Sequence, residues 1–244
     1  TQVLMSLMML GMIILQSSRA MASSKRICEV LDTEVDLTDE NASQPDKKVE
    51  SGKIEFQNVS FRYYKENHEK VLNNINLTIE SGQTVGIIGS TGCGKTTLVS
   101  MIPRLYDVDE GQVLVDGLDV KEYGLTNLRD GVGMVLQKNV LFSGTILENL
   151  QWGDSEASME EIRRVADAAQ ADGFVTSFPE GYETELGQGG VNVSGGQKQR
   201  LCIARALLRK PKILILDDST SAVDTATEAK IRETFSTSLE DTTK

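Results

Sequence analysis

Residues 84–96 read TVGIIGSTGCGKT, a short apolar run that leads directly into a glycine-rich loop ending in Lys95 and Thr96. Apolar and polar residues do not alternate in the run, which predicts a strand at residues 84–89 that is buried on both faces. The loop, residues 89–96, fits the pattern G-x-x-x-x-G-K-[ST], and the stretch that starts at its last residue, TTLVSMI at residues 96–102, is typical of a helix. A buried strand, this loop and a helix in that order predict an α/β domain with an anion site at the loop.

The glycine-rich loop has the chemistry of a phosphate site. Its glycines allow successive backbone N–H groups to turn toward one centre and bind an anion. The ammonium group of Lys95 can reach the β- and γ-phosphates of a nucleotide, and the hydroxyl of Thr96 can bind Mg²⁺. The run KILIL at residues 212–216 predicts a second buried strand, which is followed by Asp217 and Asp218. A carboxylate at the end of a parallel strand beside such a loop can hold Mg²⁺, and we expect Asp217 to do so.

Further elements follow from the periodicity of the sequence. Residues 54–61 and 75–79 have the apolar spacing of strands, and residues 158–171 and 196–209 have that of helices. Strands interleaved with helices predict an α/β domain with a largely parallel sheet at its centre.

Composition narrows the class of protein. The 244 residues hold 25 Lys and Arg against 36 Asp and Glu, a formal net charge of −11, so we expect no broad nucleic-acid surface. Apolar residues make up 39% of the chain and charged residues 25%, which is typical of a folded protein. The three cysteines, Cys28, Cys93 and Cys202, form no CxxC pair, so neither a disulfide framework nor a structural zinc site is indicated.

The N-terminal end has an apolar run at residues 3–15, VLMSLMMLGMIIL. Thirteen residues of helix rise about 20 Å, less than the roughly 30 Å hydrocarbon core of a membrane. A signal peptide would carry its basic residues before the run, whereas here Arg19, Lys25 and Arg26 follow it. That order favours the cytoplasmic end of a transmembrane helix, and a buried helix of a soluble core is the alternative. Residues 32–51 are acidic and polar, which predicts a linker before a domain that begins near residue 53.

Residues 193–200, VSGGQKQR, followed by the helical LCIARALL, resemble the signature of the nucleotide-binding domain of ABC transporters. The resemblance extends through most of residues 53–244 and is strongest to one subunit of a heterodimeric, multidrug-type ABC exporter. It implies a P-loop NTPase fold with a mixed or parallel central sheet and a helical signature subdomain, preceded by a truncated transmembrane helix. It also implies that two such domains pack head to tail, so that Ser194, Gly195, Gly196 and Gln197 face the γ-phosphate bound by a partner subunit.

The resemblance implies further site residues. Tyr63, with Val71 beside it, resembles the aromatic residue that stacks on adenine, and Tyr64 is the alternative. Gln137 resembles the glutamine that contacts Mg²⁺ and links the site to the membrane domain. Asp224 ends the stretch SAVD at residues 221–224, which resembles the loop that crosses the dimer interface.

Together, the motifs and the resemblance assign ATP and Mg²⁺ as cofactors. We expect Lys95, Gln137 and Asp218 to serve catalysis and Thr96, Gln137 and Asp217 to hold the metal. The residues expected to contact ATP are Tyr63, Val71, Gly89, Ser90, Thr91, Gly92, Cys93, Gly94, Lys95, Thr96, Thr97, Ser194, Gly195, Gly196, Gln197 and Asp224.

Asp218 departs from the family's pattern, which has Glu at this position as the general base or water-orienting group. Asp is one methylene shorter, which withdraws the carboxylate by about 1.5 Å, and a shift of about 1 Å can lower a rate about a hundredfold. We therefore expect the ATP site built on this chain's own loop to hydrolyse slowly, while the intact signature serves the site of a partner. A non-catalytic regulatory subunit and a soluble ABC ATPase are the alternatives.

The resemblance also divides the chain. Residues 1–31 become the cytoplasmic end of the last transmembrane helix and its extension, residues 32–52 an acidic linker, and residues 53–244 a nucleotide-binding domain that stops before the family's switch histidine. The full-length protein would then be a multi-pass protein of the cell membrane with its nucleotide-binding domain in the cytoplasm. Its expected partners are a second exporter subunit and an exported small molecule, lipid or peptide.

Overall fold

Two units make up the chain in the computed structural model, Thr1–Thr38 and Asp39–Lys244, and the residues described are 2–40, 42–64, 69–218 and 224–244. The first unit consists mainly of one helix, α1 (Gln2–Leu31), none of whose residues is buried. By length and apolar composition α1 could cross a membrane. The helix thus continues from the apolar run through residues 16–31 without a break, and its place in a membrane stays a prediction.

The second unit contains a four-stranded antiparallel sheet in the order β2-β1-β3-β4. The two strands predicted at residues 54–61 and 75–79 are confirmed as its first pair. In β1, Ile54 and Phe56 alternate toward the core, and an irregularity after Phe56 shifts the alternation so that Val59 and Phe61 are buried as well. The strands of this sheet are β1 (Ile54–Phe61), β2 (Leu72–Ile79), β3 (Glu110–Val115) and β4 (Leu118–Asp119).

A parallel pair of buried strands, β5 (Val132–Val135) and β8 (Ile213–Leu216), follows the pattern predicted for the centre of the domain. On the other side of β8, Thr243 forms a parallel bridge with Ile213. Lys244 next to it donates its backbone N–H to the carbonyl of Gln83 and accepts from the N–H of Val85. The C-terminal residues therefore join β8 to the segment that leads into the glycine-rich loop.

The strand predicted at residues 84–89 is wrong, because this segment forms no strand and is not buried. Ile87 is 40% exposed and Ile88 98% exposed. A strand needs a neighbouring strand for its backbone groups, and in the described part of the chain residues 86–89 pair with no other backbone segment, whereas Val85 is paired with Lys244. The run is apolar, as the prediction required, but no described strand pairs with it.

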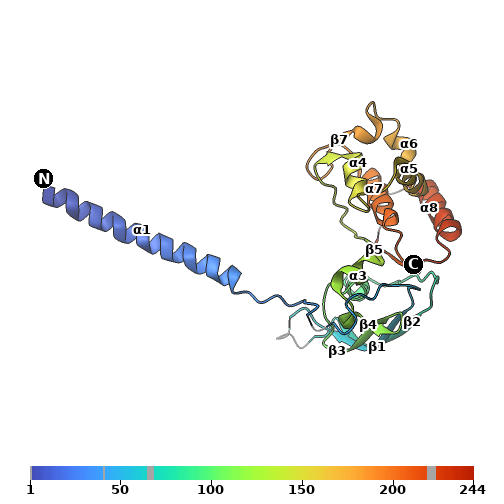
Figure 1. The fold of residues 1–244 in the computed structure, drawn as a ribbon, viewed down its shortest axis with the longest axis horizontal. Helices are drawn as coiled ribbons and strands as arrows, with labels where there is room; N and C mark the ends of the chain where they lie inside the picture. The colour runs from blue at the N-terminus through green and yellow to red at the C-terminus, as the bar shows by residue number, and fades with distance from the viewer. Residues whose placement is uncertain (1, 41, 65–68, 219–223) are drawn as a thin grey trace. The chain divides into compact units, whose positions relative to one another are not determined.

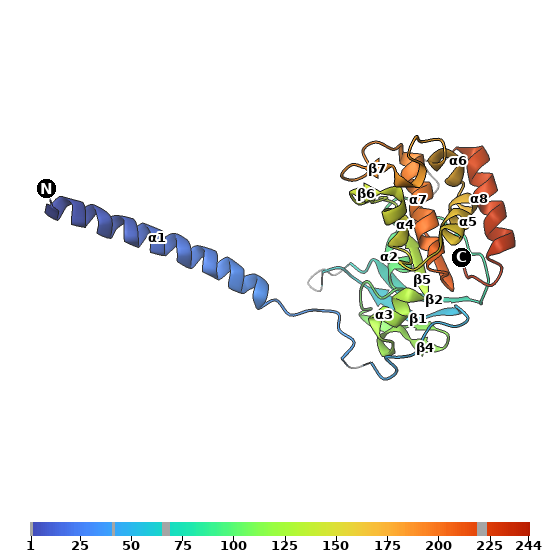
Figure 2. The ribbon, with the colours of Figure 1, turned by 45° about the horizontal axis from the view of Figure 1, so that its top comes forward.

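Helices fill the rest of the second unit. In Figures 1 and 2, α4 to α8 gather at one end, the sheet β1 to β4 lies at the other, and β5 lies between them. The helices predicted at residues 158–171 and 196–209 are confirmed as α5 and α7, and both begin with a capping box. The helices are α2 (Lys95–Ser100), α3 (Leu125–Asp130), α4 (Ile146–Gln151), α5 (Met159–Ala168), α6 (Asp172–Val175), α7 (Gly195–Leu208) and α8 (Thr225–Ser238). A short antiparallel pair, β6 (Gly144–Thr145) and β7 (Glu185–Leu186), lies beside α4.

The core of the second unit has two parts, and β8 contributes to both. One part surrounds α7, where Leu201, Ile203 and Leu208 are almost fully buried. The other lies between the four-stranded sheet, α2 and β8, and it includes Met101 and Ile213. Because β8 contributes to both, its C-terminal end is held between the two parts of the core.

Residues 39–52, which the sequence assigns to a linker, lie within the second unit. Val49 is buried. The carboxylate of Asp116, in the turn between β3 and β4, accepts the backbone N–H groups of Glu50, Ser51 and Lys53 and the hydroxyl of Ser51. The folded domain therefore begins before residue 53.

Candidate functional site

The glycine-rich loop leads into α2, and Gly94 is the residue before that helix. Gly94 has a φ of 94°, and a Cβ atom there would lie 3.2 Å from the carbonyl oxygen of Val71. Glycine is therefore needed both for the backbone conformation and for this close approach. The ammonium group of Lys95 donates to the carbonyls of Gly89 (2.8 Å) and Ser90 (2.9 Å), so that it lies inside the loop.

Thr96 and Asp217 meet although they are far apart in the sequence. The Thr96 hydroxyl donates to Oδ2 of Asp217 at 2.8 Å. The backbone N–H of Asp217 donates to the carbonyl of Val135 at 3.0 Å, which extends the pairing of β8 with β5 and sets the position of the carboxylate. A hydroxyl and a carboxylate oxygen side by side fit Mg²⁺, which prefers oxygen ligands and takes the others from phosphates and water.

Asp218 and Gln137 form the second contact between the strand ends. The Gln137 amide donates to Oδ2 of Asp218 at 3.2 Å. Asp218 has a φ of 50°, a left-handed conformation that Asp adopts more readily than most residues. Gln199 on α7 is 1% exposed and donates its amide to the backbone carbonyl of Asp218 at 3.4 Å. Sequence reasoning missed Gln199, although it lies in the signature stretch.

A cavity of about 1060 Å³ joins these groups. Lys95, Thr96, Gln137, Asp217 and Asp218 line it. The predicted base-contacting residues Tyr63 and Val71 also line it, as do Thr91, Gly92, Gly94 and Thr97. The loop residues Gly89, Ser90 and Cys93 are not among its lining residues in the described part of the chain. The structure thus brings eight of the sixteen residues predicted to contact ATP around one space large enough for a nucleotide.

The apolar wall of the cavity was not predicted. Ile87 of the exposed segment, Ile215 of β8 and Ile231 and Phe235 of α8 contribute to it. Ile231 and Phe235 are four residues apart, the spacing of one helix face, and this pattern could have indicated the helix.

The signature residues 194–197 lie at the start of α7. Ser194 is the N-cap of α7: its hydroxyl accepts the N–H of Gln197, and the Gln197 side chain accepts the N–H of Ser194. Among the described residues that line the cavity, none comes from residues 194–197. Asp224 is the N-cap of α8, and the N–H of Thr227 that it accepts lowers its pKa below the usual range. Residues 221–223, the rest of the predicted interface loop, lie outside the described residues.

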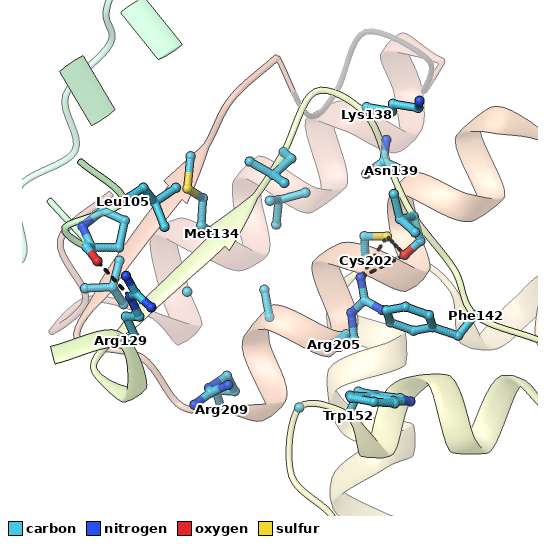
Figure 3. A pocket seen from close by; sticks show the side chains of 18 residues that line it. Leu105, Arg129, Met134, Lys138, Asn139, Phe142, Trp152, Cys202, Arg205 and Arg209 are labelled. Carbon is cyan, nitrogen blue, oxygen red and sulfur yellow. Dashed lines mark hydrogen bonds between the residues drawn. The ribbon is translucent and has the colours of Figure 1, made fainter. Parts of the chain in front are cut away.

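A second cavity, of about 380 Å³, is lined by residues of β5 among others (Figure 3). Phe142 and Trp152 have ring centroids 4.9 Å apart, and the guanidinium of Arg205 lies 5.9 Å from the Phe142 ring. Lys138, next to Gln137, and Arg209 add positive charge to the lining. This cavity is therefore basic and aromatic, and Leu136 and Lys138, the sequence neighbours of Gln137, both line it.

The fold and the larger cavity together define a P-loop nucleotide-binding domain. The family model described as ABC transporter matches residues 72–221, which is more than half of the chain. The chain therefore belongs to the ABC transporter family, and the unit Asp39–Lys244 has the fold of that family's nucleotide-binding domain.

Known relatives agree with this assignment. The chain is 48% identical over 237 residues to the Bacillus subtilis (strain 168) protein named uncharacterized ABC transporter ATP-binding protein YfiB, covering 97% of this chain and 41% of that protein. It is 48% identical over 227 residues to the putative multidrug export ATP-binding/permease protein YgaD of the same organism, covering 93% and 39%. A bacterial Atm1-family ABC exporter solved with ATP bound matches with a TM-score of 0.85 and 35% identity, covering 96% and 41%. The chain thus spans about two-fifths of the length of these relatives.

Proposed function

We propose that this chain is the ATP-binding part of an ABC exporter subunit and that it binds Mg-ATP in the larger cavity. The hydrogen bond between Thr96 and Asp217 carries the proposal, because it places a hydroxyl and a carboxylate side by side next to Lys95. The names of the relatives, which include multidrug export and permease, support an exporter rather than a soluble ATPase.

Each group in the cavity would have one task. Lys95 would leave the loop carbonyls of Gly89 and Ser90 and neutralise the β- and γ-phosphates. Thr96, Asp217 and Gln137 would hold Mg²⁺, which supplies positive charge to the phosphates when it is bound. Tyr63 would stack on the base, since it is 46% exposed at the cavity, whereas Tyr64 is 72% exposed and not among the lining residues in the described part of the chain.

Asp218 would make this site slow. Its carboxylate accepts from Gln137, and it is one methylene shorter than the glutamate of the family's pattern. A water molecule placed for attack on the γ-phosphate would then lie beyond its best reach. The signature at residues 194–197 keeps its cap and would serve the competent site of a different partner subunit, which gives a heterodimer.

A regulatory subunit is the second candidate, and the same Asp218 favours it. In that case this chain's own site would bind ATP without turnover and would only hold two subunits together. The two candidates differ in one measurable quantity, the rate of hydrolysis at this site while the general base of the partner's site is disabled. Measurable turnover supports the exporter ATPase, and none at saturating ATP supports the regulatory subunit.

The membrane part of the proposal rests on α1 and the second cavity. α1 would be the cytoplasmic end of the last span of a multi-pass protein, with the nucleotide-binding domain in the cytoplasm. The basic, aromatic cavity beside Gln137 would face the membrane domain, so that nucleotide binding is transmitted through Gln137. The transported substrate would be a small molecule, lipid or peptide.

Equilibrium titration of the full chain in detergent tests the proposed function. We expect saturable binding of ATP that Mg²⁺ strengthens and that is lost in Lys95→Met. Lys212→Met, a matched change at an exposed lysine, should bind as the unchanged chain does. Binding that survives in Lys95→Met would contradict the proposed site.

A further inference from the structure

Three aromatic rings gather beside the glycine-rich loop. The ring centroids of Tyr63 and Phe61 lie 5.0 Å apart with the planes at 82°, and those of Tyr63 and Tyr106 lie 5.2 Å apart with the planes at 88°. Both are edge-to-face arrangements, which stabilise a fixed ring orientation. Tyr106 comes from the segment between α2 and β3, whereas Phe61 ends β1, so two separate parts of the chain hold the Tyr63 ring.

A hydrogen bond of the Tyr63 hydroxyl is a third contact that orients the ring. Its oxygen lies 2.8 Å from Oγ1 of Thr97, whose residue is 5% exposed on α2. This hydrogen bond ties Tyr63 to the helix that begins with Lys95. Tyr63 nevertheless remains 46% exposed and lines the cavity, so part of its ring is available to a ligand.

Tyr106 has a different place from Tyr63. It contacts Tyr63 and Phe61, and it is not among the lining residues of the cavity in the described part of the chain. It therefore lies where it can set the orientation of the Tyr63 ring without contacting a phosphate group held by the loop.

We propose that Tyr106 is a positioning residue for base recognition: its ring, together with the Thr97 hydroxyl, holds Tyr63 in the orientation that stacks on the base of a nucleotide. The inference rests on the proposed function, because it requires ATP in the larger cavity. A ring that is already ordered loses less conformational entropy when a ligand stacks on it, so the hold raises affinity for the base. Affinity for the phosphates alone is independent of it.

Competition binding to the full chain in detergent, with Mg²⁺, separates base from phosphate recognition by comparing ATP with inorganic tripolyphosphate. In Tyr106→Leu we expect ATP affinity to fall about three- to tenfold and tripolyphosphate affinity to stay within about twofold. Tyr106→Phe keeps the ring edge and should retain ATP affinity. Tyr64→Leu is the matched control, because it makes the same change at an exposed neighbour, and it should bind both ligands as the unchanged chain does.

The contribution of the hydrogen bond between Tyr63 and Thr97 is tested by Tyr63→Phe, which keeps the ring and removes the hydroxyl. The loss of one hydrogen bond should weaken ATP about two- to tenfold with tripolyphosphate unchanged. ATP affinity equal to that of the unchanged chain in Tyr63→Phe would show that the hydroxyl does not orient the ring.

The outcomes distinguish this inference from the function on which it rests. If the unchanged chain binds neither ATP nor tripolyphosphate, the proposed function is wrong and the inference fails with it. If the unchanged chain binds ATP and Tyr106→Leu binds it equally well, only the inference is wrong. An equal loss of ATP and tripolyphosphate in Tyr106→Leu would also overturn it, since Tyr106 would then be structural.

Discussion

The hydroxyl of Thr96 donates a hydrogen bond of 2.8 Å to the carboxylate of Asp217, 121 residues farther along the chain. Thr96 is the second residue of α2, after the glycine-rich loop, and Asp217 directly follows the buried strand β8. The contact therefore joins the two motifs that were read separately in the sequence, at the place where we propose that Mg²⁺ binds.

Asp217→Asn should weaken ATP binding in the presence of Mg²⁺ by about 10- to 100-fold, because it removes the negative charge opposite the metal. Without Mg²⁺ the variant and the unchanged chain should bind ATP with similar affinity. The measurement is a titration with a fluorescent ATP analogue with and without EDTA, and Asp167→Asn on the exposed face of α5 is the control. An equal loss with and without Mg²⁺ would mean that Asp217 acts on the loop rather than on the metal.

The hydrogen bonds that the Asp116 carboxylate accepts make the stability of the domain depend on pH. Burial alone would raise the pKa of Asp116, but the hydrogen bonds from the Ser51 hydroxyl and three backbone N–H groups together lower it. A carboxyl with a lowered pKa in the folded state stabilises the fold above its unfolded pKa of about 3.9 and loses this contribution as the pH falls through the folded pKa.

Asp116→Asn should therefore lower the free energy of unfolding by about 1–3 kcal/mol near pH 7, with the difference shrinking below about pH 4. Chemical unfolding followed by circular dichroism at several pH values measures it. Asp119 is the contrasting control, since burial raises its pKa. Asp119→Asn should cost no stability near pH 7, and a pH-independent loss in Asp116→Asn would contradict the linkage.

The cap of α7 supports the signature. Ser194 and Gln197 satisfy each other's backbone N–H groups at the start of this helix. Ser194→Ala should cost about 1 kcal/mol of stability, whereas Ser194→Thr keeps the hydroxyl and should cost less. Thermal unfolding of the full chain measures both, and equal stability of the two variants would show that the hydroxyl does not cap the helix.

Local chemistry made much of the site predictable. The glycine-rich loop, the strand before Asp217 and the helix after the signature depend on residues within a few positions of one another, and the structure has all three. Long-range packing accounts for what the sequence did not reveal. Tyr106 joins Tyr63 only through tertiary contacts, and Asp116 anchors residues that looked like a free linker. The misread strand at residues 84–89 has the same cause, since a buried strand depends on a neighbour that its own composition does not specify.

The proposed slow hydrolysis depends on the side chain of Asp218. Its carboxylate accepts from Gln137, and its left-handed backbone conformation suits Asp, so that Asp218→Glu could cost about 1 kcal/mol of stability through the backbone alone. Hydrolysis must therefore be normalised to bound ATP.

We propose that this site binds Mg-ATP but hydrolyses it slowly because the Asp218 carboxylate is too short to reach the attacking water. Single-turnover hydrolysis of bound ATP by the full chain, compared between the unchanged protein and Asp218→Glu, tests this directly. We expect Asp218→Glu to hydrolyse ATP about 10- to 100-fold faster than the unchanged protein at equal occupancy, and Asp218→Asn to be slower than either. An unchanged rate in Asp218→Glu, with ATP fully bound, would contradict it.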